Sequence, residues 1–101
     1  MSRAGAVRIL GLDPGLRHTG WGVIEAEGTR IRHRGHGVLN IDASQGLSDR
    51  LAALYAGLSE VVGAWAPDEA AVEETFVNRN PVSTLKLGQA RGIVLLVPAQ
   101  A

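Results

Sequence analysis

The chain of 101 residues contains no cysteine, which excludes a disulfide framework and any metal site built on thiolates. It also has no long hydrophobic run, because its longest apolar stretch, residues 93–97, is far too short to cross a bilayer. Met1 is followed by Ser-Arg-Ala-Gly rather than by an apolar signal region. These absences predict a soluble, cytoplasmic protein with no membrane partner.

Net charge is lacking as well, since ten basic and ten acidic residues cancel, but the charges are unevenly placed. Residues 1–34 and 75–101 are basic, whereas residues 42–74 carry seven acids against Arg50 alone. Such blocks suit an enzyme that presents a positive surface beside a carboxylate pocket to a polyanion. Ordinary solvated surface explains the charges equally well. The length allows one small domain, residues 1–101, which would bury about 65% of its unfolded surface.

Residues 8–23, RILGLDPGLRHTGWGV, place one carboxylate at the end of an apolar strand. The strand ends at Asp13 because Pro14 and Gly15 stop it, and the chain then returns as a second strand. An Asp before Pro-Gly is often only a turn former. The flanking glycines also permit a ligand to approach the backbone closely. Besides the interpretation as a turn former, two functional interpretations of Asp13 are therefore open. One is a carboxylate cluster that holds a divalent metal, and the other is a phosphate-binding hairpin of the sugar-kinase and actin kind.

A third strand is predicted after the turn at residues 27–28, because its residues alternate with a period of two. The three strands follow one another as an antiparallel meander. The histidines of the chain have no metal-ligand spacing, which favours surface positions. The alternation gives the third strand two faces. One face carries Ile31, His33, Gly35, Gly37, Leu39 and Ile41, and the other, basic face carries Arg30, Arg32, Arg34 and His36.

A helix opened by Ser44 is the strongest secondary-structure prediction, because apolar residues recur from Leu47 to Trp65 at three- and four-residue steps. Ser44 is its expected N-cap, and Pro67 closes the segment. Residues 70–72 then form a short apolar strand, which a crossover helix lays parallel to the first strand. The predicted fold class is an α/β mixed sheet: three antiparallel strands, a crossover helix, a parallel strand, and a further helix from about Ser83.

Glu73 follows the parallel strand, so it is expected beside Asp13, where the carboxyl ends of neighbouring strands meet. Two adjacent carboxylates repel each other unless a cation neutralises them. The pair therefore predicts a site for Mg²⁺, for which Mn²⁺ can substitute. Glu74 alternates to the opposite side and is expected to face solvent.

Residues 72–92, VEETFVNRNPVSTLKLGQARG, together with GLDPGLRHTGWGV at residues 11–23, resemble the RuvC family of Holliday-junction resolvases. The resemblance implies a ribonuclease-H-like fold and an endonuclease of DNA recombination and repair. It implies Mg²⁺-dependent, symmetric nicking of four-way junction DNA by a homodimer that works with a branch-migration complex. By the same resemblance, Asp13 and Glu73 are catalytic metal ligands, and Phe76 stacks on a junction base.

Other residues of the second block also have expected roles. Arg79 and Asn80 follow Phe76 in a turn, where they are expected to contact DNA phosphate. The resemblance places the next helix at the dimer interface, and Gly88 and Gly92 give that helix a flat strip for another backbone. Packing of this helix on its own sheet is the alternative. The expected interface residues are Leu85, Gly88 and Gly92.

The sequence departs from the family pattern at its end, because the family continues with the last acids of a four-carboxylate site, whereas this chain stops at Ala101. The expectation is a truncated domain whose two acids leave a two-metal mechanism incomplete. Pro98 is expected to interrupt the last helix. Two alternatives to the nuclease stand: a catalytically incomplete junction-binding or dimerisation fragment, and, less favoured, an actin-like or sugar-kinase-like ATP binder, for which a second phosphate loop is missing.

Overall fold

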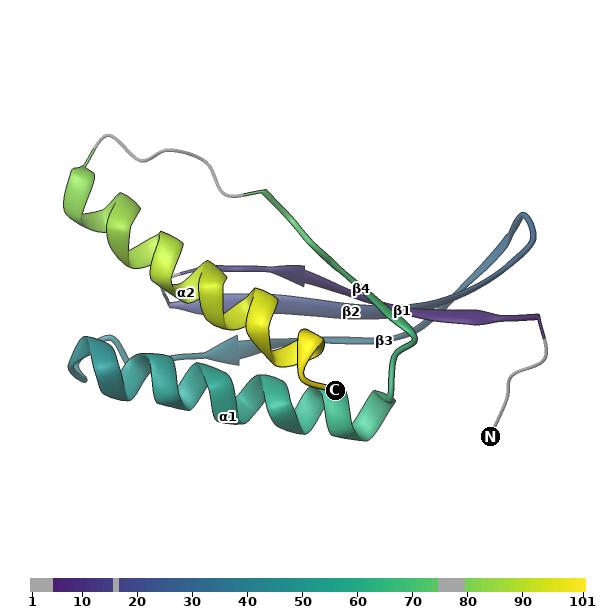
Figure 1. Cartoon of the computed structure of the whole chain (residues 1–101), viewed down its shortest axis with the longest axis horizontal. Helices are drawn as coiled ribbons and strands as arrows, with labels where there is room; N and C mark the ends of the chain where they lie inside the picture. The colour runs from purple at the N-terminus through teal and green to yellow at the C-terminus, as the bar shows by residue number, and fades with distance from the viewer. Residues whose placement is uncertain (1–4, 16, 75–79) are drawn as a thin grey trace.

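The computed structural model describes residues 5–15, 17–74 and 80–101, and its elements follow the predicted order (Figure 1). Three strands come first: β1 Val7–Asp13, β2 His18–Glu27 and β3 Arg30–Asn40. They are followed by helix α1 Leu47–Trp65, strand β4 Glu69–Val72 and helix α2 Pro81–Ala99. Within these described ranges, neither helix is both long and apolar enough to cross a membrane.

The four strands form one mixed sheet in the order β3-β2-β1-β4. β1 pairs antiparallel with β2, and β2 pairs antiparallel with β3, which confirms the predicted meander. β4 pairs with β1 in the parallel sense, with Ile9 opposite Glu69 and Leu12 opposite Val72. Helix α1 connects β3 to β4 and returns the chain so that β4 runs parallel to β1. The carboxyl ends of β1 and β4 consequently lie side by side.

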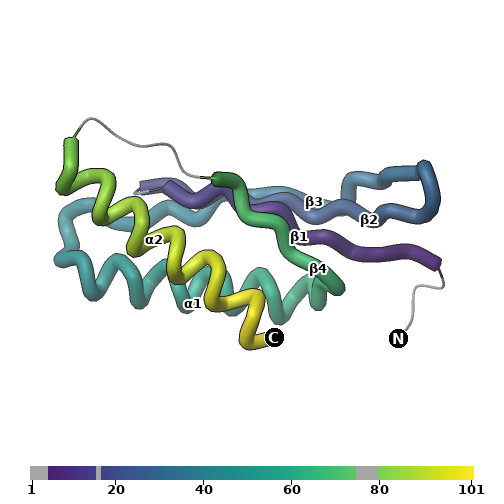
Figure 2. The backbone as a smooth tube through the Cα atoms, turned by 45° about the horizontal axis from the view of Figure 1, so that its top comes forward, coloured from purple at the N-terminus to yellow at the C-terminus, as the bar shows by residue number. Residues whose placement is uncertain are grey.

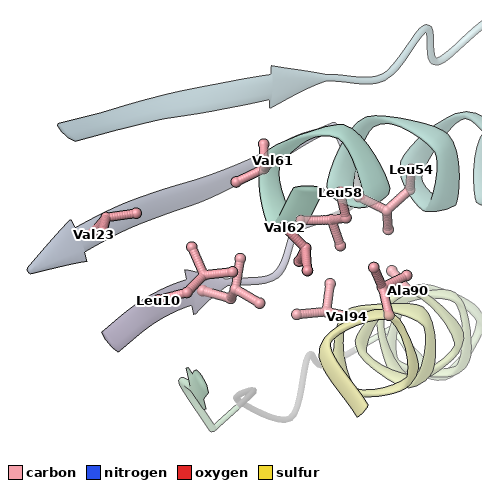
Figure 3. Close-up of a cluster of buried hydrophobic side chains, with 10 residues drawn as sticks. Leu10, Val23, Leu54, Leu58, Val61, Val62, Ala90 and Val94 are labelled. Atoms are coloured by element: carbon pink, nitrogen blue, oxygen red, sulfur yellow. The ribbon is translucent and has the colours of Figure 1, made fainter. Parts of the chain in front are cut away.

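Both helices cover the same face of the sheet, as two views of the chain show (Figures 1 and 2). The hydrophobic core lies between that face and the helices (Figure 3). Leu58 of α1 and Val94 of α2 are fully buried there, together with Leu10 of β1. Full burial of one such side chain contributes about 1.5–3 kcal/mol. The buried members of the core are Leu10, Leu12, Val23, Leu54, Leu58, Val61, Val62, Ala90, Val94 and Val97.

A β-bulge in β3 contradicts the predicted division of its faces. Val23 of β2 lies opposite Gly35, but Ile24 lies opposite His33, so Arg34 is an extra residue in β3. Because the side-chain period of a strand is two, one extra residue reverses the alternation. The prediction of a single face running through residues 31–41 was therefore wrong.

The exposure of β3 follows from that reversal. Ile31 and His33 lie on the face that α1 and α2 leave open, and Ile31 is 69% exposed. Gly35, Gly37 and Leu39 lie on the helix side, where Leu39 packs against the core. The open face of the sheet thus carries both apolar and ionisable side chains of β3.

The start of α1 also differs from the prediction. The helix begins at Leu47 with Gly46 as its N-cap, and that cap makes no side-chain hydrogen bond. The Ser44 hydroxyl instead donates a hydrogen bond to Asp42 Oδ1 (2.7 Å). Ser44 as the N-cap was therefore wrong, because the helix begins later along the chain and Ser44 lies in the preceding turn, bonded to Asp42.

Helix α2 begins earlier and continues further than predicted. It starts at Pro81 rather than near Ser83, because Asn80 caps it and proline suits the first helical turn. It continues through Pro98 to Ala99, so the prediction that Pro98 interrupts the helix was wrong. Proline removes one backbone donor at that position, and a single lost hydrogen bond in the last turn does not end the helix.

Candidate active site

Asp13 and Glu73 lie at adjoining strand ends. Asp13 is the last residue of β1, and Glu73 directly follows Val72, the last residue of β4. The Glu73 amide donates a hydrogen bond to the Leu12 carbonyl (2.9 Å), which extends the parallel pairing by one residue. The structure thus brings together the two acids that the sequence predicted as neighbours. Their catalytic role stays a prediction.

The two carboxyl groups interact directly. The negative charge of Asp13 raises the pKa of Glu73 above its ordinary value of 4.5, and a hydrogen bond between the two side chains raises it further. Desolvation is the smallest of the three causes and acts in the same direction. A divalent cation held between carboxylate oxygens would relieve the repulsion between the two groups, so the pair fits a hard metal ion.

An open groove of about 580 Å³ borders the acid pair. Gly11, Gly20 and Gly22 line it, and Gly20 lies opposite Asp13 in the pairing of β1 with β2. A Cβ added at Gly20 would lie 3.8 Å from the Asp13 Cβ, an ordinary contact distance. These glycines therefore leave space beside the acid rather than avoid a clash. A ligand can approach the backbone there closely, as the sequence predicted.

His36 of β3 lines the same groove, opposite Gly22 of β2. The sequence predicted a surface position for this residue, and its side chain is exposed. Its place in the groove with Asp13 was missed. No local sequence signal marks it, because the position depends on how β3 pairs with β2.

The residues predicted to contact DNA are only partly described. Phe76 and Arg79 lie outside the described residues, so their contacts stay predictions. The Asn80 side-chain oxygen accepts hydrogen bonds from the backbone amides of Val82 (2.9 Å) and Ser83 (3.4 Å). This N-cap role was missed, although Asn before Pro is a typical start of a helix. The contact of Asn80 with DNA stays a prediction.

The predicted interface residues lie on the exposed side of α2. Leu85 is 64% exposed, and a Cβ added at Gly88 or Gly92 would meet no atom of another element within 4 Å. Other residues of this helix, Ala90 and Val94, face the core. The helix therefore packs on the chain's own core through another face, as the alternative expected, and the glycine strip itself stays exposed. An interface at this strip stays a prediction.

The acid pair has two carboxylates. In the part of the chain that the structure describes, no group of three or more His, Asp or Glu side chains is placed to hold a metal ion. Glu74, the next acid along the chain, is exposed, as expected. The site therefore supplies part of a carboxylate set and leaves other coordination positions to water or substrate.

The sheet order, the crossover helix and the acid pair define the class of this protein. They make a ribonuclease-H-like α/β domain with carboxylates at adjoining strand ends, an arrangement suited to metal-dependent phosphodiester chemistry. Residues 9–101 match the family described as crossover junction endodeoxyribonuclease RuvC. The chain belongs to the RuvC family.

Individual relatives agree with that membership. RuvC of Paramagnetospirillum magneticum is 63% identical over 95 residues, which are 94% of this chain and 57% of that protein. RuvC of Azorhizobium caulinodans is 63% identical over 97 residues, which are 96% of this chain and 57% of that protein. A structure of T. thermophilus RuvC in complex with a Holliday junction substrate matches with a TM-score of 0.82 and 30% identity, covering 92% of this chain and 60% of that chain.

The comparisons confirm the family predicted from the two sequence blocks. They favour the nuclease over the ATP-binding alternative, because both curated relatives carry the endonuclease name. The chain spans less than two thirds of the length of these relatives.

Proposed function

We propose that this chain carries the first part of the active site of a structure-specific endonuclease that resolves Holliday junctions by paired nicks in DNA recombination and repair. The observation that carries the proposal is the direct interaction of the Asp13 and Glu73 carboxyl groups at the ends of two parallel strands. Membership of the RuvC family indicates the reaction, hydrolysis of DNA phosphodiester bonds. The relative solved with a Holliday junction substrate supports a four-way junction as the DNA partner.

Mg²⁺ is the proposed cofactor, with Mn²⁺ as a substitute, and Asp13 and Glu73 are its proposed ligands. Hard cations prefer carboxylate oxygens, and the Asp13 charge that raises the pKa of Glu73 is the kind of charge that a cation would offset. When bound, such an ion polarises a phosphoryl oxygen and lowers the pKa of bound water. The chain's own residues hold two acids close together on a sheet, beside a glycine-lined groove that leaves room for the DNA backbone.

Phe76, Arg79 and Asn80 are the proposed DNA-binding residues. In the sequence they lie between Glu73 and α2. Stacking of an aromatic ring on an unpaired base contributes about 1–3 kcal/mol and tolerates any base. Arg79 adds a cation for phosphate, which positions the DNA without reading its sequence.

A homodimer is the proposed assembly, with Leu85, Gly88 and Gly92 at its interface and a branch-migration complex as a further partner. The exposed leucine supplies apolar area, and the two glycines allow a second backbone to approach closely. A two-fold dimer presents two acid pairs in symmetric positions. Paired nicks in opposed strands of a nearly two-fold junction require that symmetry.

A second candidate function is a junction-binding or dimerisation fragment, which the small number of carboxylates favours. Two-metal hydrolysis needs more ligands than Asp13 and Glu73 provide, and the described residues bring no third His, Asp or Glu to them. We therefore propose that residues 1–101 form a single domain that binds junctions but cuts them weakly or not at all. A chain extended to the length of its relatives is expected to cut.

A junction assay with and without Mg²⁺ tests both candidates. A labelled four-way junction and a linear duplex are incubated with the 101-residue chain and with the extended chain. Binding is read by gel shift and cutting on a denaturing gel. We expect both chains to prefer the junction, and only the extended chain to make paired, symmetric, Mg²⁺-dependent nicks. Paired nicks by the purified 101-residue chain would overturn the incomplete site, and no junction preference in either chain would overturn the proposed function.

Three substitutions in the extended chain test the proposed ligands. Asp13→Asn and Glu73→Gln should each abolish nicking and leave junction binding nearly unchanged, because metal ligation and phosphate contacts are separate contributions. Glu74→Gln is the matched control and should cut normally, since this acid is exposed and is expected to face away from the pair. Equal loss of cutting from Glu74→Gln would contradict the proposed ligand set.

A further inference from the structure

The bulge in β3 brings two histidines to the same face of the sheet. His33 and His36 stand an odd number of residues apart, so an unbroken strand would place them on opposite faces. Because Arg34 is an extra residue, His33 lies opposite Ile24 and His36 lies opposite Gly22. Both imidazoles therefore project from the face away from α1 and α2, and both are exposed.

The two rings present nitrogen atoms to each other. His33 Nε2 and His36 Nδ1 are 3.0 Å apart, and the ring centroids are 5.1 Å apart with planes tilted by 47°. If both nitrogens bind one metal ion at about 2.05 Å, the nitrogen–metal–nitrogen angle is about 94°. The sine of half that angle is half the 3.0 Å separation divided by the bond length. That angle suits cis positions of a square-planar or octahedral ion, near 90°, better than the roughly 109° of a tetrahedral ion.

The surroundings leave the histidine pair accessible to a cation. Gly22 is opposite His36 and has no side chain to cover it. Arg34 directs its Nε towards Glu25 Oε1 at 3.8 Å. Glu25 also accepts a hydrogen bond from Arg8 Nη2 (2.7 Å), and Arg8 Nη1 donates to the last residue of α1, so this ion-pair cluster lies on the helix side of the sheet. Arg34, which lies between the two histidines in the sequence, is thus drawn to the other face.

We propose that His33 and His36 form a bidentate site for Cu²⁺ or Ni²⁺, with water completing the coordination. Imidazole nitrogen suits these later transition metals, whereas the oxygens of Asp13 and Glu73 suit Mg²⁺. The two sites therefore differ in metal preference. His36 lines the groove that also borders the acid pair, so the histidine-bound ion stands on the β3 side of that groove, across β2 from the acids. The proposal does not depend on nuclease activity.

Calorimetric titration of Cu²⁺, Ni²⁺ and Zn²⁺ into the untagged 101-residue chain tests the site. We expect one Cu²⁺ per chain, two imidazole nitrogens in the electron paramagnetic resonance spectrum of that form, and Ni²⁺ bound more tightly than Zn²⁺. His33→Ala and His36→Ala should each weaken Cu²⁺ binding by about tenfold or more, because the second bond of a chelate is intramolecular. His18→Ala is the control, since His18 Nδ1 is paired with Asn40 Oδ1 at 2.7 Å. Equal weakening by all three substitutions, or Zn²⁺ bound more tightly than Ni²⁺, would overturn the proposal.

Deletion of Arg34 separates the effect of geometry from that of composition. The deletion keeps both histidines but removes the bulge, so His33 and His36 should return to opposite faces and Cu²⁺ binding should weaken as much as in His33→Ala. Arg34→Ala keeps the extra residue and should bind Cu²⁺ as the parent chain does. A deleted chain with an unchanged circular dichroism spectrum and undiminished Cu²⁺ affinity would refute the proposal. If the deleted chain does not fold, the two single histidine substitutions and the two-nitrogen spectrum decide the question.

Discussion

Gly37→Ala probes the packing of two tryptophans on the helix side of the sheet. A Cβ added at Gly37 would lie 2.8 Å from three atoms of the Trp21 indole, closer than carbon atoms approach without a shift. Trp21 packs in turn on Trp65, with ring centroids 6.1 Å apart and planes tilted by 53°. Trp65 is the last residue of α1. A displaced Trp21 therefore disturbs the contact between the sheet and this helix.

The clash should outweigh the benefit of replacing a glycine. Overpacking costs about 1–3 kcal/mol, and alanine in a strand regains roughly 0.5–1 kcal/mol relative to glycine. From the centres of these two ranges, the expected net loss in the free energy of unfolding is about 1 kcal/mol. For a chain of about 100 residues, each kcal/mol shifts the midpoint of thermal unfolding by roughly 4–8 °C, so Tm should fall by about that amount.

Urea unfolding followed by tryptophan fluorescence reads both the stability and the local packing, because Trp21 and Trp65 are the two tryptophans of the chain. Gly63→Ala is the matched control. Gly63 lies in α1, and a Cβ added there would meet nothing within 4 Å, so this change should add about 1 kcal/mol through helix propensity. The reasoning is refuted if Gly37→Ala keeps the parent's urea midpoint and emission maximum while Gly63→Ala behaves as expected.

Three further predictions concern the acid pair, a buried hydroxyl and a helix cap. Asp13→Asn should lower the pKa of Glu73 towards 4.5, read by NMR titration. Because the pKa of Glu73 is higher in the folded than in the unfolded chain, protonated Glu73 stabilises the fold at pH values below the unfolded-state pKa. This stabilisation is lost as the pH rises through the folded-state pKa, so the parent should lose stability relative to Asp13→Asn over that pH range. Thr19→Val should raise the free energy of unfolding by about 1 kcal/mol, since the buried Thr19 hydroxyl has no hydrogen-bond partner among the described residues. A loss of stability in urea would contradict this prediction. Thr19→Ala leaves a void and should show no such gain. Asn80→Ala should cost about 0.5–2 kcal/mol in thermal unfolding through the lost cap of α2, whereas Asn80→Asp should retain it, and equal melting of both would argue against the cap.

The order of the elements and the neighbourhood of the two acids were predictable from the sequence. The apolar period over residues 47–65 requires an amphipathic helix, and a helical crossover from β3 makes β4 parallel to β3 and therefore also to β1, with which β4 pairs. Asp13 and Glu73 each come at the end of such a strand, so their proximity follows from local pattern and one topological rule. The blocks that carry these acids also identified the family.

The helix caps were not predictable in the same way. Ser44 and Asn80 are both good N-cap residues by type, yet only Asn80 caps a helix. The Ser44 hydroxyl donates to Asp42 instead. The choice depends on which partner lies within reach once the turn has formed, and the residue type alone does not state it.

By itself the sequence determined that Asp13 and Glu73 end neighbouring strands, because hydrophobic periodicity and the crossover rule are properties of the chain read in order. Only the tertiary structure decided which side chains share a face of β3. The bulge at Arg34 belongs to the pairing of β3 with β2, and one unpaired residue there turns His33 to the face of His36. The alternation of residues along β3 does not specify its register with β2, so the histidine pair forms only when the two strands pair.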